Sequence, residues 1–152
     1  MAGSDYEDKW GIWRNLIGDF MMEFSEIEYI SYSLWSSRVN KNTPSHNFKS
    51  RTKQVISQLN SKNDKKIKLL LEKALTISDK RNIVAHNPTL LQVFEDRETN
   101  KLYSEFAIST YVKGDYMNVA ELEELTAEVR HIKTQLYMYL GYLPYEDKNR
   151  TK

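Results

Sequence analysis

The residues with the greatest chemical potential lie close together between Asp79 and Pro88, in the order Asp-Lys-Arg-Asn-Ile-Val-Ala-His-Asn-Pro. Arg81 carries a permanent planar charge that can hold two phosphate oxygens at once. His86 can exchange protons near neutral pH. Asn82 precedes His86 by four residues, so on a helix its amide lies beside the imidazole and can orient it. These residues predict a site that stabilises a phosphate and moves protons.

Two of these residues point in different directions on a helix. Arg81 lies about 40° from the apolar centre line of the predicted helix, and Ala85 lies almost on that line. A guanidinium aimed at a packed surface needs a carboxylate or a ligand, because an unpaired buried charge is strongly destabilising. His86 lies about 140° around the helix from Arg81. We therefore expect a composite site, in which two helix ends meet across the twofold axis of a homodimer.

Other kinds of chemistry find little support in the sequence. The chain has no Cys, which excludes disulfides, zinc knuckles and thiol nucleophiles. His46 lies in a polar loop and His131 has no acidic neighbour, so we expect neither to be catalytic. The chain contains no Gly-rich phosphate loop, H-E-x-x-H, G-x-S-x-G or cluster of metal ligands. The sequence therefore predicts no cofactor and no metal ion.

The net charge of +1 hides an uneven distribution along the 152 residues. Residues 1–37 hold two basic and seven acidic residues, a net of −5. Residues 38–81 hold twelve basic and three acidic residues, a net of +9, and the remainder has a net of −3. A basic block of this kind can attract RNA through its phosphates. The alternative is that its lysines form a solvated helix face.

Hydrophobic spacing and capping residues predict four helices and one hairpin. The predicted elements, in chain order, are a long helix over 8–35, a short helix over 48–59, a helix capped by Asn63 or Asp64 that ends near His86, a hairpin with strands over 90–95 and 102–108, and a last helix from a capping box at Asn118 and Glu121 to Gly141. Short connections favour antiparallel neighbours. The predicted fold class is all-α: a four-helix up-and-down bundle with a small β-hairpin inserted between the third and fourth helices.

The chain length corresponds to one domain, predicted over 1–145, with a polar C-terminal tail over 146–152. No apolar run is long enough to span a membrane, and the acidic start lacks the features of an export signal. We therefore expect a cytoplasmic protein without a membrane partner.

The pattern Arg-Asn-x-x-x-His at the end of a third bundle helix resembles the R-x4-6-H motif of the HEPN superfamily. The likeness is best over 65–87 and, in the order of helices, covers most of the chain. It implies a HEPN-like bundle that dimerises and cuts RNA without metal, with Arg81, Asn82 and His86 as catalytic residues. Members are often toxins of toxin–antitoxin pairs, anti-phage factors or CRISPR-associated effectors, so an antitoxin or regulatory protein is a candidate partner. One subgroup has Tyr two residues after the His, where this chain has Pro88.

Metal-free RNA scission uses the adjacent 2′-hydroxyl as nucleophile and leaves a 2′,3′-cyclic phosphate and a 5′-hydroxyl. His86 fits the proton transfer, and Arg81 fits the stabilisation of charge on the phosphate. The alternative is a non-catalytic helical module that dimerises or binds a partner protein. Arg81 would then form a structural salt bridge with a carboxylate of the first helix, such as Glu23 or Glu26.

Overall fold

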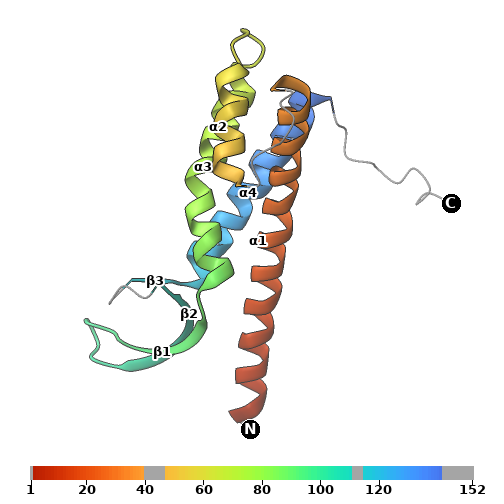
Figure 1. The fold of residues 1–152 in the computed structure, drawn as a ribbon. Coiled ribbons are helices and arrows are strands. Elements are labelled where there is room, and N and C mark those ends of the chain that lie inside the picture. The colour runs from red at the N-terminus through yellow and green to blue at the C-terminus, as the bar shows by residue number, and fades with distance from the viewer. Residues whose placement is uncertain (1, 40–46, 111–114, 142–152) are drawn as a thin grey trace, which may run out of the picture.

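The computed structural model describes residues 2–39, 47–110 and 115–141. It contains α1 (Ala2–Arg38), α2 (Phe48–Gln58), α3 (Lys65–His86), β1 (Thr89–Glu95), β2 (Leu102–Ser109), β3 (Tyr116–Met117) and α4 (Val119–Leu140). The prediction of a mainly helical chain with four helices and strands between the third and fourth is confirmed (Figure 1). The tail predicted over 146–152 lies outside the described residues.

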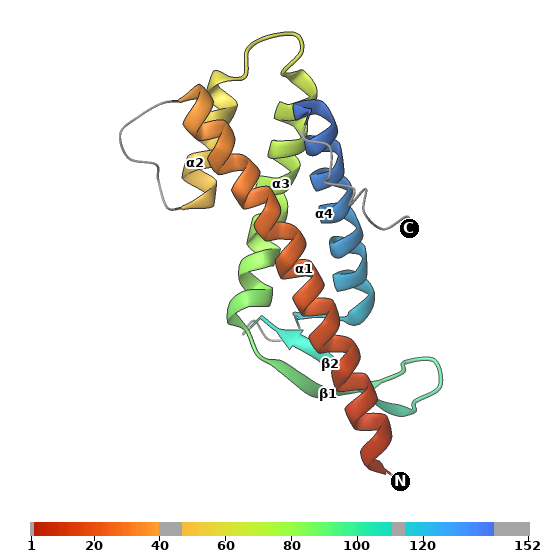
Figure 2. The same cartoon turned by 90° about the vertical axis from the view of Figure 1, so that its right-hand side faces the viewer.

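The helix α1 is longer at both ends than its apolar spacing predicted. Its buried face follows helical periodicity and consists of Trp13, Phe20, Phe24, Ile27, Ile30, Leu34 and Trp35. The extra turns at its start rest on the sheet, where the rings of Tyr6 and Trp10 each lie 5.2 Å from the ring of Phe106. Figure 2 shows this end of α1 continuing past the sheet. Tertiary contacts thus extend the helix beyond its own amphipathic pattern.

The directions of the first two helices differ from the predicted up-and-down order. Phe24 contacts Phe48, and further along both helices the Ser31 and Thr52 hydroxyls lie 2.7 Å apart, so α1 and α2 are parallel. The connection over 39–47 can reach about 30 Å when extended. That is enough to return along the 11 residues of α2, which are about 16 Å long. The up-and-down prediction is therefore wrong for this pair.

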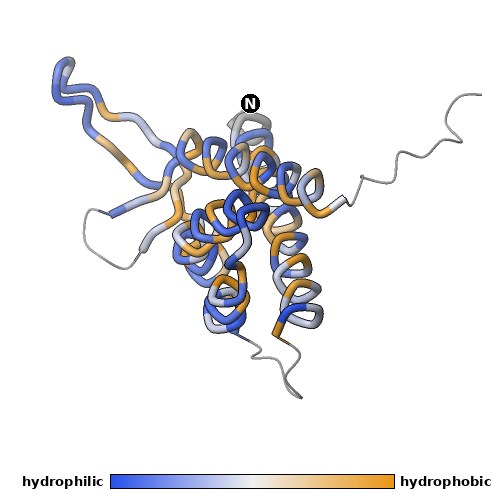
Figure 3. Tube along the Cα trace, turned by 90° about the horizontal axis from the view of Figure 1, so that it is seen from above, coloured by the Kyte–Doolittle hydropathy of each residue, from blue (hydrophilic) through white to orange (hydrophobic). Residues whose placement is uncertain are grey.

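The other two helices keep alternating directions. The start of α2 meets the end of α3 through an ion pair between Lys49 and Asp79, which makes these helices antiparallel. Helix α4 is antiparallel to α3 and parallel to α1, because Glu23 pairs with Arg130 and, further along both helices, Glu26 pairs with Tyr137. Figure 2 shows α1, α2 and α4 rising together while α3 descends. The apolar side chains of all four helices form one core, and the tip of the hairpin is hydrophilic (Figure 3).

The two predicted capping positions behave differently: one caps its helix and the other bonds elsewhere. Asn118 and Glu121 form the predicted capping box, with the Asn118 side chain accepting from the Glu121 N–H at 2.9 Å and Glu121 accepting in return at 3.2 Å. Asp64 precedes α3 as predicted but makes no side-chain cap there. Its carboxylate instead accepts from the Ser61 N–H at 3.2 Å and lies 3.4 Å from Arg38. Asp64 therefore joins the start of α3 to the end of α1.

The sheet follows α3 directly and has the order β1-β2-β3, all antiparallel. The predicted hairpin is confirmed, and β3 adds a short third strand that the sequence analysis missed, paired with Ile108 and Ser109. The Ser109 N–H donates to the Pro88 carbonyl at 3.2 Å, which ties the sheet to the residues just after α3. Among the described residues, no helix is both long and apolar enough to cross a membrane.

Candidate functional site

Arg81 lies on the side of α3 that faces α1 and α2. Of the two predicted kinds of partner, a carboxylate or a ligand, the structure shows a carboxylate: Glu28 of α1, with Oε1 3.4 Å from Nη2 of Arg81. Glu28 is separated from Glu23 by five residues, which places it about 140° around α1. The suggested partners Glu23 and Glu26 face α4 instead. The alternative prediction of a salt bridge to the first helix therefore named the correct helix but not the residue.

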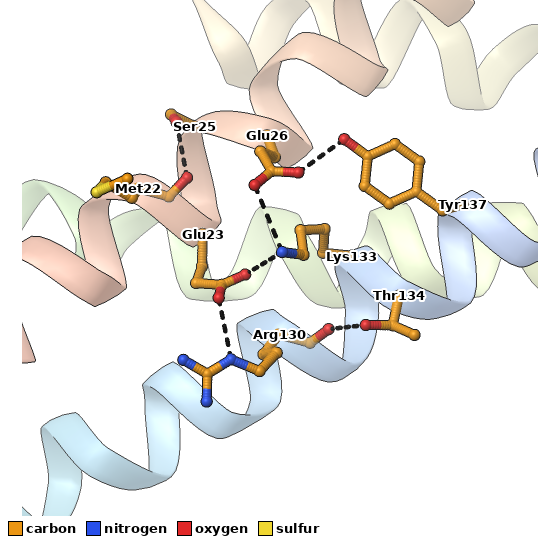
Figure 4. A network of polar contacts seen from close by, with 8 residues as sticks. All are labelled: Met22, Glu23, Ser25, Glu26, Arg130, Lys133, Thr134 and Tyr137. Atoms are coloured by element: carbon orange, nitrogen blue, oxygen red, sulfur yellow. Dashed lines mark hydrogen bonds and ion pairs between the residues drawn. The ribbon is translucent and has the colours of Figure 1, made fainter. Parts of the chain in front are cut away.

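Glu23 and Glu26 belong to a separate network between α1 and α4 (Figure 4). Glu23 accepts from Arg130 at 2.9 Å and lies 2.5 Å from the Lys133 ammonium, which also lies 3.4 Å from Glu26. The Tyr137 hydroxyl donates to Glu26 at 2.8 Å. Burial opposes ionisation of Glu23, but the hydrogen bonds from Lys133 and Arg130 outweigh it and lower the pKa of Glu23. This network joins the two helices and contains none of the predicted site residues.

A pocket of about 500 Å³ lies between α1, α2 and α3. It is lined by residues from all three helices and from the cap of α2: Phe24, Glu28, Asn47, Phe48, Lys49, Arg51, Ser78, Arg81 and Asn82. Three of the described lining side chains are cationic and one is acidic. Two predicted site residues, Arg81 and Asn82, therefore share a pocket with basic groups that the sequence analysis did not connect to them.

Arg51 is the main site residue that sequence reasoning missed. It is only 8% exposed, and its guanidinium donates to the Glu28 carbonyl at 3.2 Å and lies 5.9 Å from the centre of the Tyr32 ring. Burial lowers the pKa of Arg51, although the Glu28 carboxylate opposes that shift. The available signal was its position beside Thr52 in the buried stripe of α2. A basic residue in such a stripe indicates a specific electrostatic role.

The start of α2 supplies the rim of the pocket. Asn47 caps α2, and its side chain accepts from the backbone N–H groups of Lys49 and Ser50. The parallel course of α1 and α2 brings this helix end beside Glu28. Lys49 reaches across to Asp79 of α3 and forms an ion pair at the same rim. The pocket therefore depends on the direction of α2, which the sequence did not reveal.

Asn82 is exposed and lies next to Arg81. Its side-chain oxygen accepts a hydrogen bond from Arg81 Nη1 at 3.4 Å. Among the described residues, no hydrogen bond joins Asn82 to His86. This protomer therefore does not show the predicted contact between Asn82 and the imidazole. The amide oxygen of Asn82 accepts instead from the guanidinium of Arg81, a charged and therefore stronger donor.

His86 is the last residue of α3, and its side chain is exposed. The neighbouring Ala85 is also exposed and Val84 is buried, so the expected position of Ala85 on the apolar centre line is wrong. Because α3 is continuous through this segment, His86 stays about 140° around the helix from Arg81 and does not line the pocket. One protomer thus does not bring Arg81 and His86 together.

Of the other two histidines, the structure describes His131, which takes no part in this arrangement. His131 is exposed on α4, away from the pocket-lining residues, and His46 lies outside the described residues. The described part of the chain contains no group of three or more His, Asp or Glu side chains that could hold a metal ion.

Comparisons with protein-family models, curated proteins and solved structures found no match to this chain. The resemblance to the HEPN superfamily therefore depends on Arg81, Asn82 and His86 and on the order of the helices. Chemically, the pocket offers two guanidinium groups near one carboxylate, an arrangement suited to an anion. The exposed imidazole of His86 offers proton transfer to whatever reaches the end of α3.

Proposed function

We propose that this protein is a metal-independent endoribonuclease of the HEPN type, acting as a toxin or anti-phage defence factor. The observation that carries the proposal is the placement of Arg81 and Asn82 on a pocket in which, among the described lining residues, cationic side chains outnumber acidic ones by three to one. RNA phosphate suits this pocket, and its scission needs the proton transfer that His86 at the end of α3 offers.

Each residue has a defined role in the proposed reaction. The 2′-oxygen attacks the adjacent phosphorus as its proton leaves, and the bond from phosphorus to the 5′-oxygen breaks as that oxygen gains a proton. His86 exchanges these protons. Arg81 holds the non-bridging oxygens on which charge accumulates, and Asn82 keeps the guanidinium in place through their hydrogen bond.

A homodimer is part of the proposal because Arg81 and His86 diverge on one helix. The exposure of His86 and its position at the helix end leave it accessible to a second protomer. A twofold axis near this end of α3 would let His86 of one chain approach the phosphate held by Arg81 of the other. The cytoplasmic location and an antitoxin or regulatory partner belong to the same proposal.

The decisive experiment incubates structured and single-stranded RNA with the wild type, Arg81→Ala and His86→Ala in the presence of EDTA. His131→Ala is the matched control, since it removes another exposed histidine. We expect 2′,3′-cyclic phosphate and 5′-hydroxyl ends from the wild type and His131→Ala, and a loss of at least about 100-fold in the other two variants. Circular dichroism checks the helical content of each variant. Intact RNA with the wild type, or full activity in His86→Ala, would refute the proposal, and growth arrest on induction provides a second assay.

Mixing the two inactive variants tests the composite site. A heterodimer of Arg81→Ala and His86→Ala chains retains one complete pair across its interface, so a random mixture should recover up to about a quarter of the wild-type activity. No recovery, from variants shown to exchange subunits, would place both residues of each site in one chain.

The second candidate function is a non-catalytic module for dimerisation or partner binding. The ion pair between Arg81 and Glu28 favours it, because this contact gives the guanidinium a structural partner within one protomer. Under this alternative the wild type leaves RNA intact, and Arg81→Ala lowers stability without any change in nucleolytic activity.

A further inference from the structure

The charges around the pocket are unequal, and Glu28 is the residue that partly balances them. Its carboxylate lies 3.4 Å from Arg81, and it also acts electrostatically on the buried Arg51. Lys49 is paired with Asp79, which does not line the pocket. Among the described lining residues, Glu28 is the one carboxylate that faces two guanidinium groups. The pocket therefore carries more positive than negative charge.

The contact between Arg81 and Glu28 is of a kind that a stronger anion can replace. The two side chains are 27% and 28% exposed, and the contact is a single long one. Partly exposed single contacts of this type contribute little to stability. A phosphate group, whether terminal or within a phosphodiester, presents two non-bridging oxygens that can accept two hydrogen bonds from one guanidinium. It can therefore compete with Glu28, which makes one long contact with Arg81.

Arg51 is prepared for such a ligand by its surroundings. The Glu28 carbonyl accepts a hydrogen bond from its guanidinium, and the Tyr32 ring lies beneath it. These contacts hold the charge at the pocket wall, so little side-chain freedom is lost when an anion binds.

We propose that this pocket is a phosphate-binding site formed by Arg51 and Arg81, and that Glu28 is a built-in competitor that the phosphate displaces from Arg81. The inference rests on the proposed function for the identity of the ligand in the cell, an RNA phosphodiester. Arg51 acts as a second phosphate contact, and Glu28 selects against anions that cannot engage both guanidinium groups.

The test measures the binding of two probes by calorimetry: inorganic phosphate and a short 2′-O-methyl oligoribonucleotide, which lacks the nucleophile and is not cut. Glu28→Gln removes the competing charge and keeps the side-chain shape. Glu7→Gln is the matched control, because it makes the same charge change at an exposed position near the other end of α1. We expect Glu28→Gln to bind at least one probe about tenfold more tightly than the wild type and Glu7→Gln to match the wild type. A gain in affinity for inorganic phosphate alone indicates that the ligand is a free or terminal phosphate. A gain in affinity for the oligonucleotide indicates that it is a phosphodiester.

Equal affinity of Glu28→Gln and the wild type for both probes would overturn the inference. If Glu28→Gln does not fold, Arg81→Gln provides the test. Probe binding by the wild type that Arg81→Gln abolishes supports the site. A wild type that binds neither probe, or an Arg81→Gln variant that binds as tightly as the wild type, overturns it. The two proposals fail separately. If Glu28→Gln changes the affinity for a probe but the wild type cuts no RNA, the nuclease is rejected and the phosphate site is kept. If the wild type cuts RNA but Glu28→Gln leaves the affinity unchanged, the phosphate site is rejected and the nuclease is kept.

Discussion

Helix α1 carries carboxylates toward two different neighbours, and the two resulting clusters differ in charge balance. Toward α4, Glu23 and Glu26 meet Arg130 and Lys133, two acidic groups against two basic ones. Toward α2 and α3, Glu28 is the one carboxylate among the described lining residues of a cavity of about 500 Å³, where it pairs with Arg81 and acts electrostatically on Arg51. The first cluster is neutral and closed by direct contacts, and the second retains positive charge and open space.

This difference separates a structural role from a binding role. In the α1–α4 network, Glu23 is 16% exposed and Lys133 is 18% exposed, so water screens their attraction only partly. In the pocket, the side chains of Arg81 and Glu28 are more exposed and make one long contact. Equal numbers of acidic and basic groups that pair directly hold helices together. An excess of one charge beside a cavity favours a ligand of the opposite charge.

The largest expected effect is on stability, where the two clusters should respond unequally. Glu23→Gln leaves Arg130 and Lys133 without their shared carboxylate, and we expect a loss of about 2 to 3 kcal/mol in the free energy of unfolding. Glu28→Gln should cost about 1 kcal/mol. Urea denaturation followed by circular dichroism at pH 7 measures both, with Glu7→Gln as the control expected to change little. A larger loss for Glu28→Gln would reverse the roles assigned to the two clusters.

A smaller effect concerns the hydroxyl that closes the α1–α4 network. Burial and the hydrogen bond to Glu26 raise the pKa of Tyr137 to about 12. Because its folded pKa exceeds the ordinary value of 10.0, the associated stability is present below pH 10 and is lost as the pH rises toward 12. Tyr137→Phe should cost about 1 kcal/mol at pH 7 and should lose less stability than the wild type over that alkaline range. Tyr139→Phe is the control, since Tyr139 is exposed, and equal alkaline losses in all three proteins would contradict the prediction.

The smallest effect should appear in acid. The pKa of Glu23 is lowered from its ordinary value of 4.5, so its contribution is present above that pH and is lost as the pH falls through the lower folded value. Unfolding free energies measured at pH 7 and at decreasing pH should therefore fall more steeply in the wild type than in Glu23→Gln. Parallel curves for the two proteins would show that the network does not favour the ionised carboxylate.

Local sequence signals predicted much of the fold. The capping pair Asn118 and Glu121 marked the start of α4 because it bonds to nearby backbone N–H groups. Pro88 marked the end of α3 because its ring disfavours the helical conformation in the residue before it. The short strand β3 was missed, since its two residues gain their structure from pairing with β2 and carry no periodic pattern of their own. The early start of α1 was missed for the same reason, as contacts with the sheet support it.

In the candidate site, too, local sequence determined some features and long-range contacts determined others. Its motif residues, Arg81, Asn82 and His86, and the need of Arg81 for a carboxylate or a ligand follow from residue type and helical spacing alone. Their long-range neighbours do not, because Glu28 and Arg51 come close to Arg81 only through the parallel course of α1 and α2. Side-chain chemistry and helix periodicity are local properties that a sequence contains directly. The direction of a packed helix is set by the whole core, so only the tertiary structure decided which charges meet and where the pocket lies.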